Sequence, residues 1–130
     1  MSRETLQPPG WARPRGYANG VAATGRLVFV AGQIGWDAEQ RFASDGFAAQ
    51  VRQALANVVA VLACAGAKPE HLVRMTWYVT SRDEYNAALA EVGAAWRELI
   101  GRNFPAMSVV VVAGLLEPRA KVEIEATAVV

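Results

Sequence analysis

The sequence predicts an α+β domain in which two amphipathic helices cover one face of a mixed β-sheet. Apolar residues recur at steps of three and four over residues 47–65 and again after Ser81, as on one face of an α-helix. Residues 72–80 and 121–130 instead alternate apolar and polar side chains, as strands with one buried face do. Because both helices would pack on one face, the other face of the sheet needs cover, and oligomerisation would supply it.

The N-terminal part is expected to hold an irregular arm followed by two strands. Residues 1–14 contain three of the six prolines and are predicted to be irregular. Gly20–Thr24 is a predicted strand, and the apolar run over residues 26–32 is a second one. Gly25 lies between the two strands and tolerates a positive φ, so we expect them to pair as a hairpin.

Both predicted helices carry end signals. The first is expected to begin at an Asp45 N-cap and to end at Gly66 in the left-handed conformation. The second is expected to begin at a capping box formed by Ser81 and Glu84 and to end at Gly101. Their apolar stripes are Phe47, Val51, Leu55, Val58 and Leu62 in the first helix, and Tyr85, Leu89, Val92, Trp96 and Leu99 in the second.

The last three predicted strands, residues 72–80, 108–113 and 121–130, complete the order β-β-α-β-α-β-β. Their alternation assigns side chains to opposite faces of the sheet. In the first of them, the predicted core side carries Val73, Met75, Trp77 and Val79. In the last, Val122, Ile124, Ala126 and Ala128 face opposite to Lys121, Glu123, Glu125 and Thr127.

Composition narrows the class of protein. The 130 residues fit one domain over residues 1–130, and 53% hydrophobic residues are more than so small a chain easily buries alone. Thirteen basic and twelve acidic residues give a net charge of +1 without a basic stripe, which argues against a nucleic-acid partner. No leading apolar run resembles a signal peptide or a membrane span, so we expect a cytoplasmic protein with no membrane partner.

The sequence gives little support for cofactor chemistry. Cys64 is the single cysteine and has no evident cationic neighbour that would activate it. His71 is the single histidine and lacks metal-binding spacing, so no metal site is predicted. The glycines form neither a dinucleotide fingerprint nor a P-loop. We therefore expect no cofactor.

Five segments together resemble the RidA/YjgF family, in the family's order and over the chain from about Tyr17 to its end. They are VFVAGQIGWD (28–37), AQVRQALANVVAVLACAGA (49–67), VRMTWYVT (73–80), NFPAMS (103–108) and VEIEATAVV (122–130). The resemblance implies a chorismate-mutase-like fold assembled as a homotrimer, with clefts between subunits. It also implies hydrolysis of reactive enamine and imine intermediates to ammonia and a keto acid, without a metal or organic cofactor.

The resemblance assigns roles to individual residues. Tyr17 matches a tyrosine that enters the cleft, and Glu123 matches the carboxylate that positions or activates the attacking water. Gly32 and Gln33 match the turn that lines the site.

Three positions depart from the family's pattern. Met107 stands at the arginine that holds the substrate's carboxylate, Ala31 stands at a serine, and Gly93 falls near an asparagine of some members. We therefore expect negligible turnover of 2-iminobutyrate-type substrates. In an extended arm Arg15 would point the same way as Tyr17, which makes Arg15 a candidate replacement for the missing cation.

Each of these residues also has a simpler interpretation. Glu123 and Glu125 lie two apart on one strand and would form a solvated polar face unless another subunit closes over them. Met107 and Val109 fit core packing as well as a pocket wall, and Arg15 fits a solvated loop.

Two functions follow from this sequence. The first is a deaminase of enamine or imine small molecules with an altered substrate range, in which Glu123 handles water and Tyr17 orients the ligand. The alternative is a non-catalytic small-molecule-binding trimer, with Met107 and Val109 lining an apolar pocket. Some family members are described as ribonucleases, but the near-neutral charge counts against that activity here.

Overall fold

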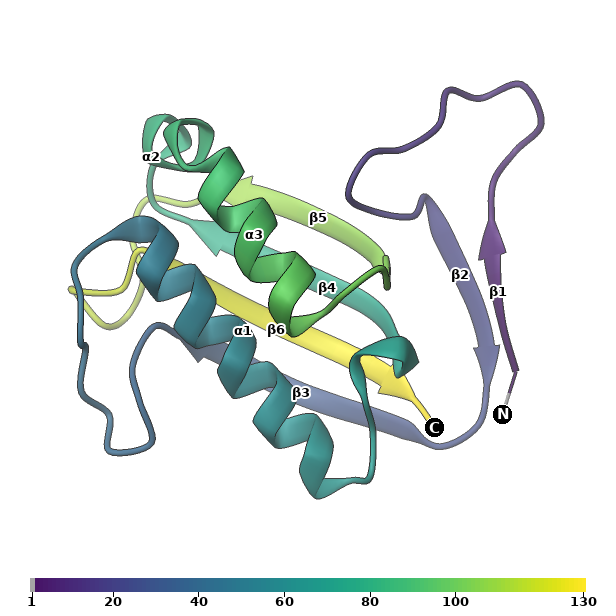
Figure 1. Ribbon diagram of the computed structural model, residues 1–130, viewed down its shortest axis with the longest axis horizontal. Helices are drawn as coiled ribbons and strands as arrows, with labels where there is room; N and C mark the ends of the chain where they lie inside the picture. Colours follow the sequence, from purple (N-terminus) through teal and green to yellow (C-terminus); the bar gives the residue numbers. More distant parts are fainter. Residues whose placement is uncertain (1) are drawn as a thin grey trace.

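The computed structural model describes residues 2–130, and Figure 1 shows how their elements are arranged. In chain order they are β1 (Ser2–Leu6), β2 (Gly20–Thr24), β3 (Leu27–Ile34), α1 (Phe47–Cys64), the 3₁₀ turn η1 (Pro69–His71), β4 (Leu72–Val79), α2 (Arg82–Ala87), α3 (Leu89–Leu99), β5 (Ala106–Val111) and β6 (Val122–Val129).

A mixed sheet forms the centre of the fold, as predicted, but it has four strands because β2 is not part of it. Its strand order is β3-β6-β4-β5, with β4 and β5 parallel and the other pairs antiparallel. Helices α1 and α3 lie side by side over one face of this sheet (Figure 1). The other face has no helix over it in the part of the chain that the structure describes.

The core lies between α1, α3 and the covered face of the sheet. The alternation of β6 is confirmed, since Val122 and Ile124 are fully buried while Glu125 between Ile124 and Ala126 is exposed. Trp77 is the largest fully buried side chain, and a residue of this size contributes about 2–3 kcal/mol by burial. The fully buried residues from the predicted first stripe are Val51, Leu55, Val58 and Leu62.

The prediction for α1 is confirmed at its C-terminal end and wrong at its N-terminal end. Gly66 adopts a φ of +69°, and the amide of Ala67 donates to the carbonyl of Leu62, which closes the C-terminus. The predicted Asp45 N-cap is wrong, because the cap residue is Gly46 and no side chain bonds the first turn. Asp45 instead accepts a hydrogen bond of 2.9 Å from Arg119, which ties two loops together. By length and composition α1 could cross a membrane, but its apolar stripe is buried in the core.

The predicted second helix is divided in two. Ser81 caps its start as predicted, since Ser81 Oγ accepts from the amide of Glu84 at 3.1 Å. The return bond of the capping box is absent because the Glu84 carboxylate accepts from Lys121 Nζ at 3.0 Å. At Ala88 the amide bonds back to Tyr85, three residues earlier, and this tighter turn separates α2 from α3.

The N-terminal segment departs most from expectation. The predicted irregular arm is wrong for residues 2–6, because β1 pairs antiparallel with β2 from Ser2↔Thr24 to Leu6↔Gly20. The predicted pairing of β2 with the next strand is also wrong, since β3 pairs with β6. The chain does turn at Gly25, where φ is +145°, but the turn directs β2 away from the sheet.

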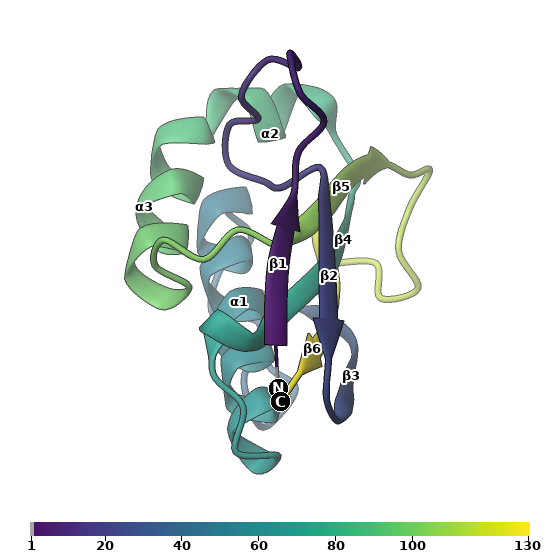
Figure 2. The ribbon, with the colours of Figure 1, turned by 90° about the vertical axis from the view of Figure 1, so that its right-hand side faces the viewer.

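The β1–β2 hairpin lies across one end of the four-stranded sheet, in front of the strand ends in Figure 2. Arg3 anchors it, because Nη2 donates to the carbonyls of Leu72 at 3.3 Å and Phe104 at 3.1 Å. The amide of Ala18 donates to the carbonyl of Pro105 at 2.9 Å. The loop that joins the two strands is thereby held beside the start of β5.

Gly35, directly after β3, has no room for a side chain. A Cβ atom there would lie 2.5 Å from Cβ and 2.7 Å from Cα of Gln50, which is 1% exposed on α1. The side chain of Gln50 cannot move aside, because it bonds the carbonyls of Ser44 and Arg119 and the amide of Lys121.

We expect Gly35→Ala to lower the free energy of unfolding by about 1–3 kcal/mol, because β3 or α1 must shift. Chemical denaturation measures the change. Gly114→Ala is the matched control, since a Cβ at Gly114 meets no atom within 4 Å and should change stability by less than about 0.5 kcal/mol. Equal effects of the two substitutions would contradict this packing.

Candidate functional site

The predicted site residues fall into two groups on opposite faces of the sheet. Met107 and Val109 of β5 pair in register with Met75 and Trp77 of β4, whose side chains are buried beneath the helices. Glu123 of β6 pairs with Tyr78, which points to the uncovered face. Within one chain, Glu123 therefore does not share a site with Met107.

The first group lines a pocket between α3, β5 and the N-terminal loop. Arg15, Tyr17, Met107 and Val109 all border this pocket, whose volume is about 860 Å³. Met107 and Val109 are half-buried and also pack against the edge of the core, so they serve as core and as pocket wall together. The loop enters beside β5 because Ala18 bonds Pro105, and this places Tyr17 at the pocket.

Aromatic residues form much of the wall of this pocket. Trp96 of α3 stacks on Phe104 with ring centroids 6.3 Å apart and planes 9° apart. Trp77 lies 6.1 Å from Trp96 at a tilt of 38°. The sequence analysis assigned Trp77 to the core side of its strand and Trp96 to the apolar stripe of a helix, and only their convergence in space marks them as pocket residues.

The second group surrounds Glu123 on the uncovered face. Gly32 leaves the space that the Glu123 carboxylate occupies, because a Cβ at Gly32 would lie 2.5 Å from Oε2 and 2.7 Å from Cδ. Ala31 and Gly32 are exposed in a bulge where the pairing of β3 with β6 is interrupted. Gln33 follows this bulge but pairs with Ile124, whose side chain is buried in the core, and Gln33 Nε2 donates to the carbonyl of Ala31 at 3.1 Å. Among residues 2–130 no group donates a hydrogen bond to the Glu123 carboxylate.

Glu125, two residues further along β6, has a partner that the sequence analysis did not single out. Tyr78 Oη donates to Glu125 Oε1 at 2.8 Å. This hydrogen bond, with burial and the negative charges of Glu125 and Glu123, raises the pKa of Tyr78 above its ordinary value. The alternation of β4 places Tyr78 on the face opposite to Trp77, so its orientation could be predicted from the sequence. Its hydrogen-bond partner could not.

The remaining candidates lie outside both groups. Cys64 is exposed and makes one weak contact, from Sγ to the carbonyl of Ala60 at 3.6 Å. His71 Nδ1 accepts from the amide of Lys68 at 2.9 Å within η1. Over residues 2–130 no three His, Cys, Asp or Glu side chains gather as metal ligands.

The fold and these two groups define a class of small α+β protein whose mixed sheet carries helices on one face and carboxylates on the other. The model of the family described as Endoribonuclease L-PSP matches residues 11–130. The chain belongs to this family, which is the RidA/YjgF family.

Relatives agree with this assignment. The chain is 36% identical to a 2-iminobutanoate/2-iminopropanoate deaminase of Salmonella typhimurium over 87% of this chain and 86% of that protein. It is 30% identical to the Homo sapiens protein of the same name over 96% and 86% of the two chains. Among solved structures, a Rid-family protein of unknown function, YyfB from Yersinia pestis, aligns with a TM-score of 0.88 and 32% identity over 100% of both chains. The E. coli YjgF gene product aligns with a TM-score of 0.68 and 34% identity over 87% of each chain.

We expect Glu125→Gln to lower the pKa of Tyr78 towards its ordinary value. The tyrosinate form is disfavoured beside two carboxylates, and the substitution removes one of these charges together with the strongest acceptor. Ultraviolet absorbance titration follows tyrosine ionisation, and subtraction of a Tyr78→Phe titration isolates this residue. An unchanged alkaline titration in Glu125→Gln would show that the Tyr78–Glu125 bond does not form in solution.

Proposed function

We propose that this protein is a hydrolytic deaminase of enamine or imine metabolites that works as a homotrimer. The observation that carries the proposal is the position of Glu123, whose carboxylate packs against Gly32 on the uncovered face and receives no hydrogen bond within residues 2–130. Such a carboxylate is available to a water molecule. The names of the relatives support the class of reaction.

The chemistry needs one proton acceptor and no electron transfer. Glu123 accepts a proton from water while the water oxygen bonds to the imine carbon, which gives a carbinolamine. Glu123 gives this proton to the nitrogen. The carbinolamine hydroxyl then loses its proton to Glu123, which passes it to the nitrogen as the C–N bond breaks with its electrons on nitrogen and the carbon–oxygen double bond forms. Imine and water thus become a carbonyl compound and ammonia.

A site that contains all the predicted residues requires two chains. Glu123, Gly32 and Ala31 lie on the uncovered face, whereas the pocket of Tyr17 and Met107 lies at the β5 edge of the covered face. If the β5 edge of one chain packs on the uncovered face of a neighbour, both groups border one cleft. Closure would exclude bulk water and strengthen Glu123 as a base.

Exposed apolar side chains support this assembly. Phe29 on β3 is 73% exposed and Val110 on β5 is 41% exposed, and their pairing with Thr127 and Tyr78 places both on the uncovered face. Burying such side chains between subunits stabilises an assembly by roughly 25 cal/mol per Å². A monomer in analytical ultracentrifugation would contradict both the assembly and the deaminase.

A non-catalytic small-molecule-binding trimer is the second candidate. It is favoured by Met107, since a thioether in place of a guanidinium leaves β5 without a charge that fixes a substrate. The two candidates differ in one requirement, because only the deaminase needs the Glu123 carboxylate.

We expect Glu123→Gln to lower kcat for imine hydrolysis by about 10²–10⁴-fold, because the amide cannot accept the proton from water. Ammonia release above the spontaneous rate measures it. Glu125→Gln is the matched control on the same face of the same strand and should stay within about threefold of the wild type.

Gly32→Ala tests the same carboxylate without changing it. The added Cβ must displace the flexible end of Glu123, so kcat should fall while the melting temperature changes little. If ligands bind but neither substitution affects any turnover, the binding trimer is the correct function.

We expect 2-iminobutanoate to be a poor substrate. Loss of an arginine–carboxylate pair costs about 2–5 kcal/mol, which lowers kcat/KM by more than about 30-fold. Met107→Arg should recover part of this loss, and Met107→Leu, which adds no charge, should not. The imine is generated in situ by an amino-acid oxidase. Efficient ammonia release by the unmodified protein would refute this expectation.

A further inference from the structure

The pocket beside Met107 is bordered by four arginines. Arg13 and Arg15 come from the N-terminal loop, Arg97 from α3 and Arg102 from the segment after α3. No aspartate or glutamate lines this pocket. A second hollow shares three of these arginines, adds Arg3, and is also lined by no acid.

None of the four arginines has a partner among residues 2–130. Other cations of the chain pair with acids, such as Arg119 with Asp45 and Lys121 with Glu84. Arg13, Arg15, Arg97 and Arg102 form neither an ion pair nor a side-chain hydrogen bond within the described residues. Gathered guanidinium groups repel one another, so this arrangement favours a bound anion.

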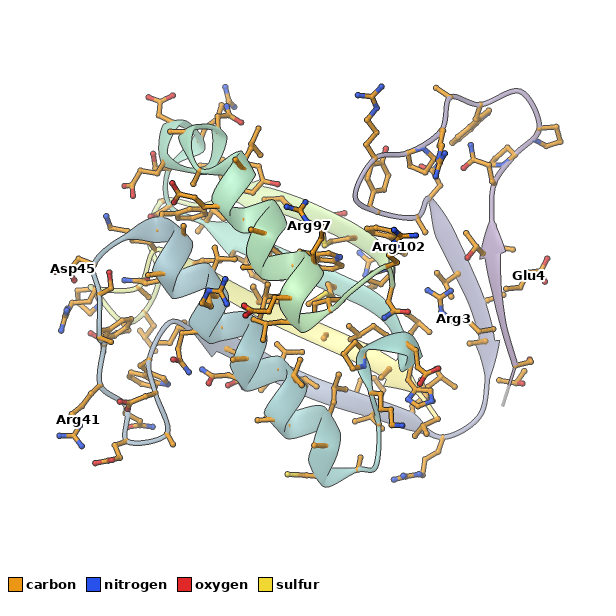
Figure 3. The ribbon with its side chains drawn as sticks, viewed as in Figure 1. Arg3, Glu4, Arg41, Asp45, Arg97 and Arg102 are labelled. Atoms are coloured by element: carbon orange, nitrogen blue, oxygen red, sulfur yellow. The ribbon has the colours of Figure 1, made fainter. Side chains whose placement is uncertain are left out.

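The positions of these side chains fit a common target. Figure 3 shows Arg97 and Arg102 on the side of α3 that faces the N-terminal loop. Arg97 lies over Gly93, since a Cβ there would be 3.5 Å from Nη1. The loop itself is held against β5 by the Ala18–Pro105 bond, which brings Arg13 and Arg15 to the same opening.

Below the arginines the pocket is apolar and aromatic. The stacked pair Trp96 and Phe104 forms one side, and Met107 and Val109 form another. A flat apolar group fits such walls, because rings stack on aromatic faces and thioethers contact ring edges.

We propose that this pocket binds a small molecule with an aromatic body and an anionic end, the body beside Trp96, Phe104 and Met107 and the anion at the arginines. The inference rests on the proposed function in that it names the substrate class of the same site. Strand β5 carries no cation, and the positive charges of this pocket stand on α3, on the segment after it and on the N-terminal loop. The substrate is therefore longer than a two- or four-carbon imino acid, with its charge held away from Met107.

Binding of saturated probes tests this without any turnover. Isothermal titration measures the affinity for hydrocinnamate, phenethyl phosphate, hydrocinnamamide and acetate. Comparison of the four separates the contribution of the aromatic body from that of the negative charge. Either aromatic anion should bind at least about tenfold more tightly than hydrocinnamamide or acetate. Which of the two anions binds more tightly identifies the anionic group as a carboxylate or a phosphate.

Substitution of the arginines gives the second measurement. Arg102→Gln and Arg15→Gln should each weaken the aromatic anions by about three- to tenfold and leave hydrocinnamamide unchanged. Arg82→Gln on α2 is the matched control, since Arg82 is exposed, unpaired among residues 2–130 and outside the pocket, and it should have no effect.

Two results would overturn the inference. One is equal affinity for hydrocinnamate, phenethyl phosphate and hydrocinnamamide, and the other is an equal loss for charged and neutral probes in the arginine variants. Titration of the Glu123→Gln variant separates this inference from the deaminase. If this variant still binds the aromatic anions and the wild type hydrolyses no imine, only the proposed deaminase activity is rejected. If the wild type hydrolyses imines but shows no preference for aromatic anions, only the proposed substrate class is rejected.

Discussion

The sheet carries helices on only one face, and the rest of the molecule's chemistry depends on this asymmetry. The alternation of β6 sends Val122 and Ile124 into the core and Glu123 and Glu125 to the uncovered side. An uncovered face that also displays Phe29 at 73% exposure combines apolar area with acidic groups. Apolar area drives association, and association would desolvate the acids beside it. An assembly formed through this face would therefore link stability and reactivity.

The parallel pairing of β4 with β5 determines where the other half of the chemistry lies. In register with Met75 and Trp77, the side chains of Met107 and Val109 must point beneath α3. A charged residue at position 107 would reach a ligand directly from the strand, whereas methionine leaves an apolar wall. The cations at this pocket instead stand on α3 and on the loop that reaches it. A change of one strand residue therefore alters both the polarity of the wall and the distance at which a negative charge is held.

Local patterns predicted the elements that local forces determine. The stripe of α1, the alternation of β4 and β6, the Ser81 cap and the glycine after α1 all follow from periodicity or from backbone geometry. The errors concern choices between partners far apart in sequence. Asp45 bonds Arg119, Glu84 bonds Lys121, and β3 pairs with β6, and no pattern near any of these residues encodes its partner. The candidate site residues were chosen by resemblance, but their division between two faces needed the register of the sheet.

The N-terminal β1–β2 hairpin is the element that the sequence predicted least well, and it is also the element that brings Tyr17 and Arg15 to the candidate site. Turn chemistry at Gly25 was visible in the sequence, yet a turn does not specify which strand its neighbour joins. In the structure β2 is not part of the sheet and pairs with β1, and Arg3 fixes the hairpin to the carbonyls of Leu72, at the start of β4, and Phe104, just before β5. That anchorage is what places Tyr17 and Arg15 beside Met107. The wrong prediction for the pairing of β2 and the unpredicted position of Tyr17 and Arg15 beside Met107 therefore have one origin, which is the long-range docking of the N-terminal hairpin.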